Sequence, residues 1–183
     1  MSRFEIRFSG SGGQGLILAG VIFAEAATIF DKKNAVQSQS YGPEARGGAS
    51  KSEVIISDQA IHFPKATSID LQLSLTQESC TKYYKDLKPD GTLLVDEDFV
   101  REIPKGTFKV IKLPIIRTAA EEIGKSFVAN IVAIGAIAGI SGQVTYEAIE
   151  KAVLSRVPKG TEELNKKALK AGFDLANKAR TVA

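Results

Sequence analysis

The sequence predicts an α/β fold in three layers, with helices on both faces of a largely parallel, Rossmann-like sheet. Strand-like runs alternate with helix-like runs along the chain, which is the pattern of βαβ units. A glycine-rich turn, Gly10 to Gly15, joins the first of these strands to the first helix. A length of 183 residues lies within the usual size of one compact unit. We therefore expect a single domain over residues 1–183.

The predicted strands are short apolar or alternating runs bounded by turn residues. In Leu71 to Leu75, leucine alternates with polar residues. Pro89-Asp90-Gly91 predicts a turn before the next strand. The six predicted strands are Phe4–Phe8, Asn34–Ser38, Lys51–Ile56, Leu71–Leu75, Thr92–Val95 and Phe108–Leu113.

Helical spacing predicts the remaining elements. Thr145 is a plausible N-cap for the helix that follows it. Phe127 to Ile140 is an apolar run of about 14 residues, shorter than the roughly 20 residues that a membrane helix needs. It is better interpreted as a buried helix, in which the amide of Asn130 must find a partner in the glycine turn or in a neighbouring subunit. The predicted helices are Leu16–Ala27, Glu78–Leu87, Ala119–Ile123, Phe127–Ile140, Thr145–Leu154 and Glu162–Lys178.

Two glycine-rich segments carry the chemistry that the sequence predicts. The first, Gly10 to Gly15, reads Gly-Ser-Gly-Gly-Gln-Gly, and glycine there permits positive φ and a close approach of backbone N–H groups to a ligand. The helix that follows adds about half a positive charge at its N-terminus. The second segment, Ser40 to Gly48, reads Ser-Tyr-Gly-Pro-Glu-Ala-Arg-Gly-Gly. We expect the two segments to meet at one end of the sheet and to bind an anion.

Two side chains of the second segment add to this expectation. Arg46 has forked donors that suit a phosphate or a carboxylate, and its alternative is an ion pair with Glu44 or with an acid of another subunit. Tyr41 suits a nucleotide base or, more readily, a subunit interface. The candidate binding residues are Gly10, Ser11, Gly12, Gly13, Gln14, Gly15, Tyr41, Arg46, Gly47 and Gly48.

A nicotinamide site would need a further residue that this chain lacks. In a dinucleotide-binding fold, a carboxylate about 20 residues beyond the glycine turn binds the ribose hydroxyls. The second predicted strand ends Val36-Gln37-Ser38-Gln39, without an acid or an arginine. Asp31 precedes that strand, and Glu44 lies in the following loop. The sequence thus disfavours an NAD-binding enzyme.

Taken together, the two glycine-rich segments resemble those of the gamma subunit of 2-oxoacid:ferredoxin oxidoreductases. This group includes the pyruvate, 2-oxoisovalerate and 2-oxoglutarate enzymes. The likeness covers nearly the whole chain. It includes Val54 to Asp58, Asn130 with Gly135, and Asn165 to Gly172.

The resemblance implies a role in a multi-subunit enzyme. Such an enzyme oxidatively decarboxylates a 2-oxoacid, with 2-oxoglutarate or pyruvate favoured, releases the acyl group as its coenzyme A thioester and passes electrons to ferredoxin. The implied partners are alpha-, beta- and delta-type subunits and, through the complex, ferredoxin. Thiamine diphosphate would lie between the alpha and beta subunits, with iron–sulfur clusters in the beta and delta parts and magnesium in the assembled enzyme. This chain would bind no cofactor alone and could offer its glycine turn to part of coenzyme A.

Composition excludes several other functions. The net charge of +3, from 24 basic and 21 acidic residues, argues against nucleic acid or a membrane as partner. Cys80 is the only cysteine and His62 the only histidine, so the chain alone offers no ligand set for an iron–sulfur or zinc centre and no catalytic triad. A single cysteine and the absence of a secretory signal at the N-terminus lead us to expect a cytoplasmic protein.

We therefore expect a gamma subunit that is inactive in isolation, carries no catalytic residue and self-associates through surfaces that its partners would cover. Two alternatives remain open. One is an assembly module whose glycines serve only packing and subunit contact. The other is a nucleotide-dependent reductase, which the missing acid disfavours.

Overall fold

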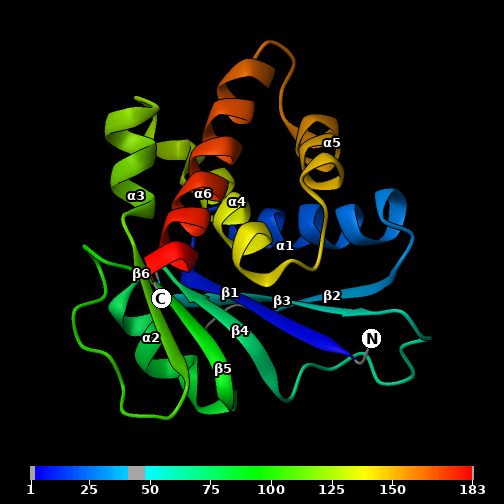
Figure 1. Ribbon diagram of the computed structural model, residues 1–183, viewed down its shortest axis with the longest axis vertical. Coiled ribbons are helices and arrows are strands. Elements are labelled where there is room, and N and C mark those ends of the chain that lie inside the picture. Colours follow the sequence, from blue (N-terminus) through cyan, green and yellow to red (C-terminus); the bar gives the residue numbers. More distant parts are fainter. Residues whose placement is uncertain (1–2, 41–47, 183) are drawn as a thin grey trace.

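A six-stranded sheet forms the centre of the molecule in the computed structural model, which describes residues 3–40 and 48–182 (Figure 1). The strands lie side by side in the order β2-β3-β1-β4-β5-β6. Their bounds are β1 Phe4–Ser11, β2 Asn34–Ser40, β3 Ala49–Ser57, β4 Ile69–Ser74, β5 Leu87–Asp96 and β6 Lys109–Leu113.

The sheet is largely parallel, as predicted. β1 pairs in parallel with β4, β4 with β5, and β5 with β6. β3 pairs in antiparallel fashion with both β1 and β2. Among the described strands, β3 alone therefore runs against the others, and the carboxyl ends of β1, β4, β5 and β6 meet at one edge.

Helices cover the two faces of the sheet unequally. Figure 1 shows α1 (Leu16–Glu25), α4 (Ala129–Ser141), α5 (Tyr146–Arg156) and α6 (Glu162–Val182) on one face, with α2 (Gln77–Tyr83) on the other. The short helix α3 (Ile115–Arg117) follows β6. Four short helical segments precede or follow these helices in the described residues: η1 Ala26–Phe30, η2 Tyr84–Asp86, η3 Thr118–Glu122 and η4 Ser126–Val128. Thr145 caps α5, as predicted, and its side chain accepts from the N–H of Ala148.

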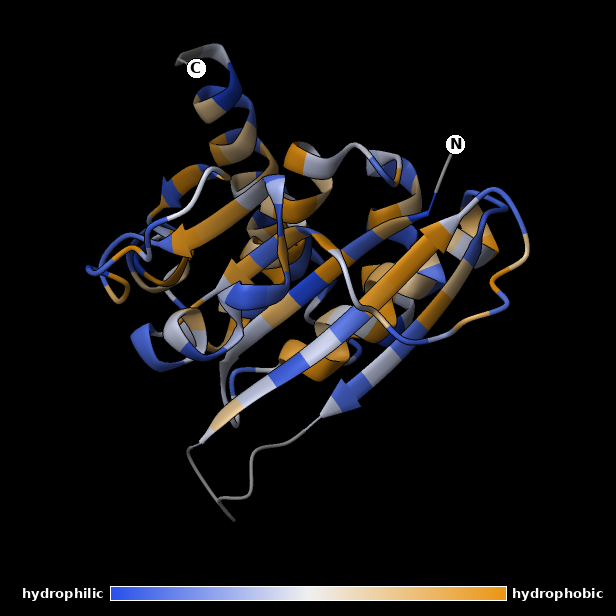
Figure 2. Cartoon of the chain, turned by 90° about the horizontal axis from the view of Figure 1, so that it is seen from below, coloured by the Kyte–Doolittle hydropathy of each residue, from blue (hydrophilic) through white to orange (hydrophobic). Residues whose placement is uncertain are grey.

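Alternation along β1 explains why the two faces differ. Ile6 and Phe8 point into the main core, which lies between the sheet and the four larger helices. Glu5, Arg7 and Ser9 alternate with them and are also buried. Figure 2 looks onto this second face, where polar and apolar residues alternate along the strands. A smaller apolar cluster also lies there, formed by Ile55, Ala66, Ile69, Cys80, Leu87, Leu93, Val95 and Val100.

Helix α4 is buried against α6 through close backbone contact. A Cβ atom on Gly135 would lie 2.1 Å from the carbonyl oxygen of Leu169, and one on Gly172 would lie 1.9 Å from that of Val132. These positions admit only glycine in this packing. The interpretation of the apolar run as a buried helix is confirmed from Asn130 to Gly139, whereas Phe127 precedes α4 and is exposed. No helix in residues 3–40 and 48–182 is long and apolar enough to cross a membrane.

Two predicted boundaries are wrong. The helix predicted to reach Leu87 ends at Tyr83, because Leu87 begins β5 and joins the small apolar cluster. The turn predicted at Pro89 to Gly91 lies inside β5, where the pairing with β4 jumps from Leu87 to Thr92. Proline has no N–H for the ladder, so the strand bulges there instead of ending.

Candidate ligand-binding site

The first glycine segment forms a tight connection between β1 and α1. Strand β1 continues through Ser11, so Gly10 and Ser11 belong to the strand and only the four residues after them form the turn. Gly13 and Gly15 have φ values of 90° and 71°. Both lie in the left-handed region that favours glycine, which is why the sequence needs glycine at these two positions.

Hydrogen bonds within the turn engage several of the N–H groups that were expected to face a ligand. The N–H of Ser11 donates to Oε1 of Gln14 at 2.8 Å, and that of Gln14 to the carbonyl of Ser11 at 3.4 Å. The N–H of Gly12 donates to the carbonyl of Gly48 at 3.2 Å. Within the described residues, the N–H groups of Gly13, Gly15 and Leu16 make no hydrogen bond. These three N–H groups are among the donors available to an anion.

Gly10 has a packing role. A Cβ atom there would lie 2.2 Å from Oε1 of Gln14 and 2.7 Å from Cδ1 of Leu16. The small residue lets the Gln14 side chain fold back over the end of β1, where it accepts from Ser11. Gly10 and the Gln14 carboxamide oxygen therefore shape the turn from within.

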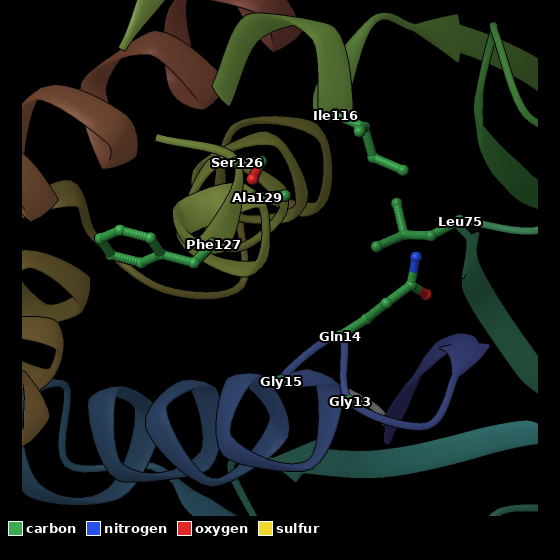
Figure 3. Close-up of a pocket in the computed structure, with 8 residues that line it drawn as sticks. All are labelled: Gly13, Gln14, Gly15, Leu75, Ile116, Ser126, Phe127 and Ala129. Carbon is green, nitrogen blue, oxygen red and sulfur yellow. The ribbon is translucent and has the colours of Figure 1, made fainter. Parts of the chain in front are cut away.

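A cavity of about 240 Å³ opens beside the turn. Figure 3 shows the side chain of Gln14 directed toward Leu75, which follows β4, while Phe127 points outward on the far side of the α4 start. Phe127 is 69% exposed. The cavity is lined by Gly13, Gln14, Gly15, Leu75, Ile116, Ser126, Phe127 and Ala129.

The cavity lies where the connections of the sheet diverge. From β1 the chain crosses one face through α1 toward β2, whereas from β4 it crosses the opposite face through α2 toward β5. β1 and β4 are neighbours and parallel. In open α/β sheets, ligands bind outside the carboxyl ends of the strands at such a switch point. The topology therefore supports a ligand site beside the glycine turn.

Asn130 joins the turn to α4. Its Nδ2 donates to the carbonyl of Gly15 at 3.4 Å, and the residue is 8% exposed. Of the two partners predicted for the Asn130 amide, the glycine turn is the one that the structure shows. As a result, the starts of α1 and α4 are held side by side at the cavity, and the positive ends of both helix dipoles lie near it.

Comparison with known proteins decides the family. A family model described as pyruvate ferredoxin/flavodoxin oxidoreductase matches residues 5–175. The chain belongs to this oxidoreductase family.

Individual members of the family are similar over nearly their full length. The 2-oxoglutarate synthase subunit KorC of Methanocaldococcus jannaschii is 52% identical over 176 residues, which cover 95% of this chain and 94% of that subunit. The pyruvate synthase subunit PorC of the same organism is 29% identical over 174 residues, which cover 93% of this chain and 95% of that subunit. The crystal structure of a keto/oxoacid ferredoxin oxidoreductase gamma subunit from Geobacter sulfurreducens PCA has 58% identity and a TM-score of 0.91, and covers 98% of this chain and 99% of that one.

In this member of the oxidoreductase family, the structure brings together the candidates Gly10, Ser11, Gly12, Gly13, Gln14, Gly15 and Gly48. The hydrogen bond from Gly12 to Gly48 confirms that the first segment meets the end of the second. Tyr41, Arg46 and Gly47 lie outside the described residues. Leu75, Ile116 and Phe127 line the cavity but were not among the predicted site residues, because ordinary apolar residues give no sequence signal of a ligand.

Asp96 supports the far wall of the cavity. It is the last residue of β5 and is fully buried. Its carboxylate accepts from the N–H groups of Asp98, Phe99 and Ile116 at 3.1, 3.2 and 2.8 Å. Burial raises the pKa of Asp96, and the three N–H donors oppose that shift in part. The contact with Ile116 fixes the start of α3 beside the cavity.

The remaining polar candidates stand apart from this site. Cys80 is buried in the small apolar cluster, and burial raises the pKa of its thiol, as befits a structural residue. His62 lies in the connection between β3 and β4. Among the described residues, no group of three or more His, Cys, Asp or Glu side chains could hold a metal ion.

Proposed function

We propose that the chain is the gamma-type subunit of a 2-oxoglutarate:ferredoxin oxidoreductase. The observation that carries the choice of 2-oxoacid is the contrast between two subunits of one organism, since identity to its 2-oxoglutarate synthase subunit is 52% and to its pyruvate synthase subunit 29%. The assembled enzyme would convert 2-oxoglutarate and coenzyme A to succinyl-coenzyme A and carbon dioxide, with two electrons passing to ferredoxin.

Within such an enzyme, this chain would contribute no reacting group. Thiamine diphosphate, magnesium and the iron–sulfur clusters would be held by the alpha-, beta- and delta-type partners, in keeping with the single buried cysteine of this chain. A reduced cysteine also fits a cytoplasmic enzyme. The contribution of this chain would be to complete the assembly and to bind part of a substrate.

The glycine turn is proposed to bind an anionic part of coenzyme A. The N–H groups of Gly13, Gly15 and Leu16 are available donors, and two helix N-termini provide positive potential. A volume of about 240 Å³ is below the usual range for a complete ligand of this size, roughly 300–1,000 Å³. The cavity therefore suits one phosphate-bearing portion of coenzyme A, with the remainder contacting partner subunits.

Purification from the source cell through a tag on this chain tests the proposal. Mass spectrometry would identify the companion chains, and reduction of ferredoxin would be followed with 2-oxoglutarate, pyruvate or 2-oxoisovalerate, each with and without coenzyme A. We expect the highest kcat/KM with 2-oxoglutarate and strict dependence on coenzyme A. A complex that prefers pyruvate would contradict the choice of substrate, and recovery of the chain without oxidoreductase subunits would contradict the assigned role.

The assembly-module alternative has one observation in its favour. The N–H groups of Ser11, Gly12 and Gln14 are engaged inside the protein, so part of the glycine pattern is explained by local structure alone. Saturation-transfer NMR on the purified complex distinguishes the two roles. Coenzyme A signals that lose intensity on Gly13→Val, in a complex that still assembles, would support binding, and unchanged signals would support assembly alone.

A further inference from the structure

Two side chains of helix α2 bind the main chain of Ala49, the residue that follows the second glycine-rich segment. Ala49 is the first residue of β3 and directly follows Gly48, whose carbonyl accepts from Gly12. The N–H of Ala49 donates to Oε1 of Glu78 at 3.3 Å, and the hydroxyl of Tyr83 donates to the carbonyl of Ala49 at 2.9 Å. Both side chains come from α2, which packs on the opposite face of the sheet from α1.

A buried arginine fixes the end of α2 to the central strand. Arg7 of β1 is fully buried, and its Nη1 donates to the carbonyl of Tyr83 at 2.6 Å. Its Nη2 lies 2.6 Å from a carboxylate oxygen of Glu53 and 2.7 Å from one of Asp86. The side chains of Arg7 and Glu53 are buried, whereas that of Asp86 is half exposed. Removing Arg7 would leave the Glu53 carboxylate without this partner and the Tyr83 carbonyl without its donor, so Arg7 fixes the end of α2 on the sheet.

The ring of Tyr83 is also surrounded by cations. The guanidinium carbon of Arg7 lies 5.8 Å from the ring centroid, and the ammonium groups of Lys51 and Lys82 lie 5.5 and 5.7 Å from it. These contacts orient the aromatic ring independently of its hydroxyl. Removing the hydroxyl alone should therefore leave the ring in place.

We propose that Tyr83 and Glu78 are positioning residues that set Gly48, the last residue of the second glycine-rich segment, against the glycine turn. Because α2 binds both the N–H and the carbonyl of Ala49, it places the preceding carbonyl, that of Gly48, where it accepts from the N–H of Gly12. That bond holds the turn with the N–H groups of Gly13 and Gly15 free of partners among the described residues. The consequence for coenzyme A rests on the proposed function, whereas the placement of Gly48 against Gly12 does not.

The test compares Tyr83→Phe with Tyr84→Phe in the assembled complex. Tyr84 is one residue along, and its hydroxyl makes no hydrogen bond within the described residues, so the same chemical change there is a matched control. Hydrogen–deuterium exchange would be measured in the peptides that contain Gly12 and Ala49. Steady-state kinetics would give KM for coenzyme A and kcat. A second pair, Glu78→Ala and Glu78→Gln, removes and keeps an acceptor oxygen for the N–H of Ala49.

Tyr83→Phe should raise exchange at Gly12 and Ala49 about fivefold, the loss expected for one net hydrogen bond, and raise KM for coenzyme A by a similar factor at unchanged kcat. Tyr84→Phe should change neither the amide exchange nor the KM for coenzyme A. The amide of Ala49 should exchange more slowly in the Glu78→Gln variant than in the Glu78→Ala variant. Exchange that matches the wild type at both sites would overturn the positioning role, whatever happens to KM.

Two further outcomes separate this inference from the proposed function. Faster exchange at Gly12 and Ala49 with an unchanged KM would support the positioning role and contradict binding of coenzyme A at the turn. Faster exchange throughout the sheet together with a lowered Tm would show that Tyr83 supports the fold as a whole, and this would overturn the positioning role.

Discussion

The side-chain amide of Asn130 lies against Gly15, and this contact joins the starts of α4 and α1 at the mouth of the cavity. Nδ2 of Asn130 donates to the carbonyl of Gly15 at 3.4 Å, and a Cβ atom on Gly15 would lie 2.6 Å from that same nitrogen. Gly15 also has a φ of 71°. Glycine is therefore required at this position for two independent reasons. The backbone has a positive φ, and the Asn130 side chain leaves no room for a Cβ atom.

Gly15→Ala should destabilise the protein more than Gly13→Ala. Both residues have positive φ, which costs alanine about 1–2 kcal/mol, but only Gly15 has an atom within 4 Å of the added Cβ. We expect an additional loss of about 1 kcal/mol at Gly15, measured by urea unfolding. In an Asn130→Ala background that extra loss should disappear. Equal losses in the two single variants would contradict the contact.

Arg7→Met should lower the free energy of unfolding by about 3 kcal/mol, the lower end of the range for breaking a buried ion pair. The loss stays at that end because Lys51 still lies 2.8 Å from Glu53 after Arg7 is removed. Lys170→Met, which removes an exposed partner of Asp174, should leave the free energy unchanged within error. Denaturant unfolding of both variants checks the difference. A loss at Arg7 as small as that at Lys170 would show that α2 is not held by this network.

Arg46→Ala should raise KM for coenzyme A about ten- to a hundredfold without dissociating the complex. The expectation follows from the loss of a charge-assisted hydrogen bond to a phosphate, since about 1.4 kcal/mol corresponds to each factor of ten. Arg156→Ala is the control, because Arg156 pairs with Glu25 at the opposite end of α1 from the glycine turn. Size-exclusion chromatography would verify assembly. An intact Arg46→Ala complex with unchanged coenzyme A kinetics would show that Arg46 does not contribute to coenzyme A binding.

Most of the fold could be predicted from the sequence because periodicity and turn residues act locally. All six strands and the four larger helices lie where the pattern predicted them. The errors fall where tertiary contacts override local signals. Leu87 has good helical neighbours but is drawn into β5 by burial. Pro89 to Gly91 form a strand irregularity because β4 continues to pair beyond them.

The candidate site was only partly predictable. Glycine spacing indicated the turn, and the buried amide of Asn130 indicated a contact with it. The pattern could not indicate which N–H groups remain available, because that depends on Gln14 folding back onto Ser11 and on Gly48 reaching Gly12 from a distant segment. Tyr83 gave no signal either, since its contact with Ala49 joins residues 34 positions apart.

Add-back of this chain to its companion subunits tests the central claim most directly. The companions would be purified without this chain, and ferredoxin reduction would be measured with 2-oxoglutarate and coenzyme A before and after the purified chain is added. We predict little activity from either part alone and restoration at one equivalent of chain, with 2-oxoglutarate preferred over pyruvate. Companions that are fully active without the chain, or a restored activity that prefers pyruvate, would contradict the assignment as the gamma-type subunit of a 2-oxoglutarate:ferredoxin oxidoreductase.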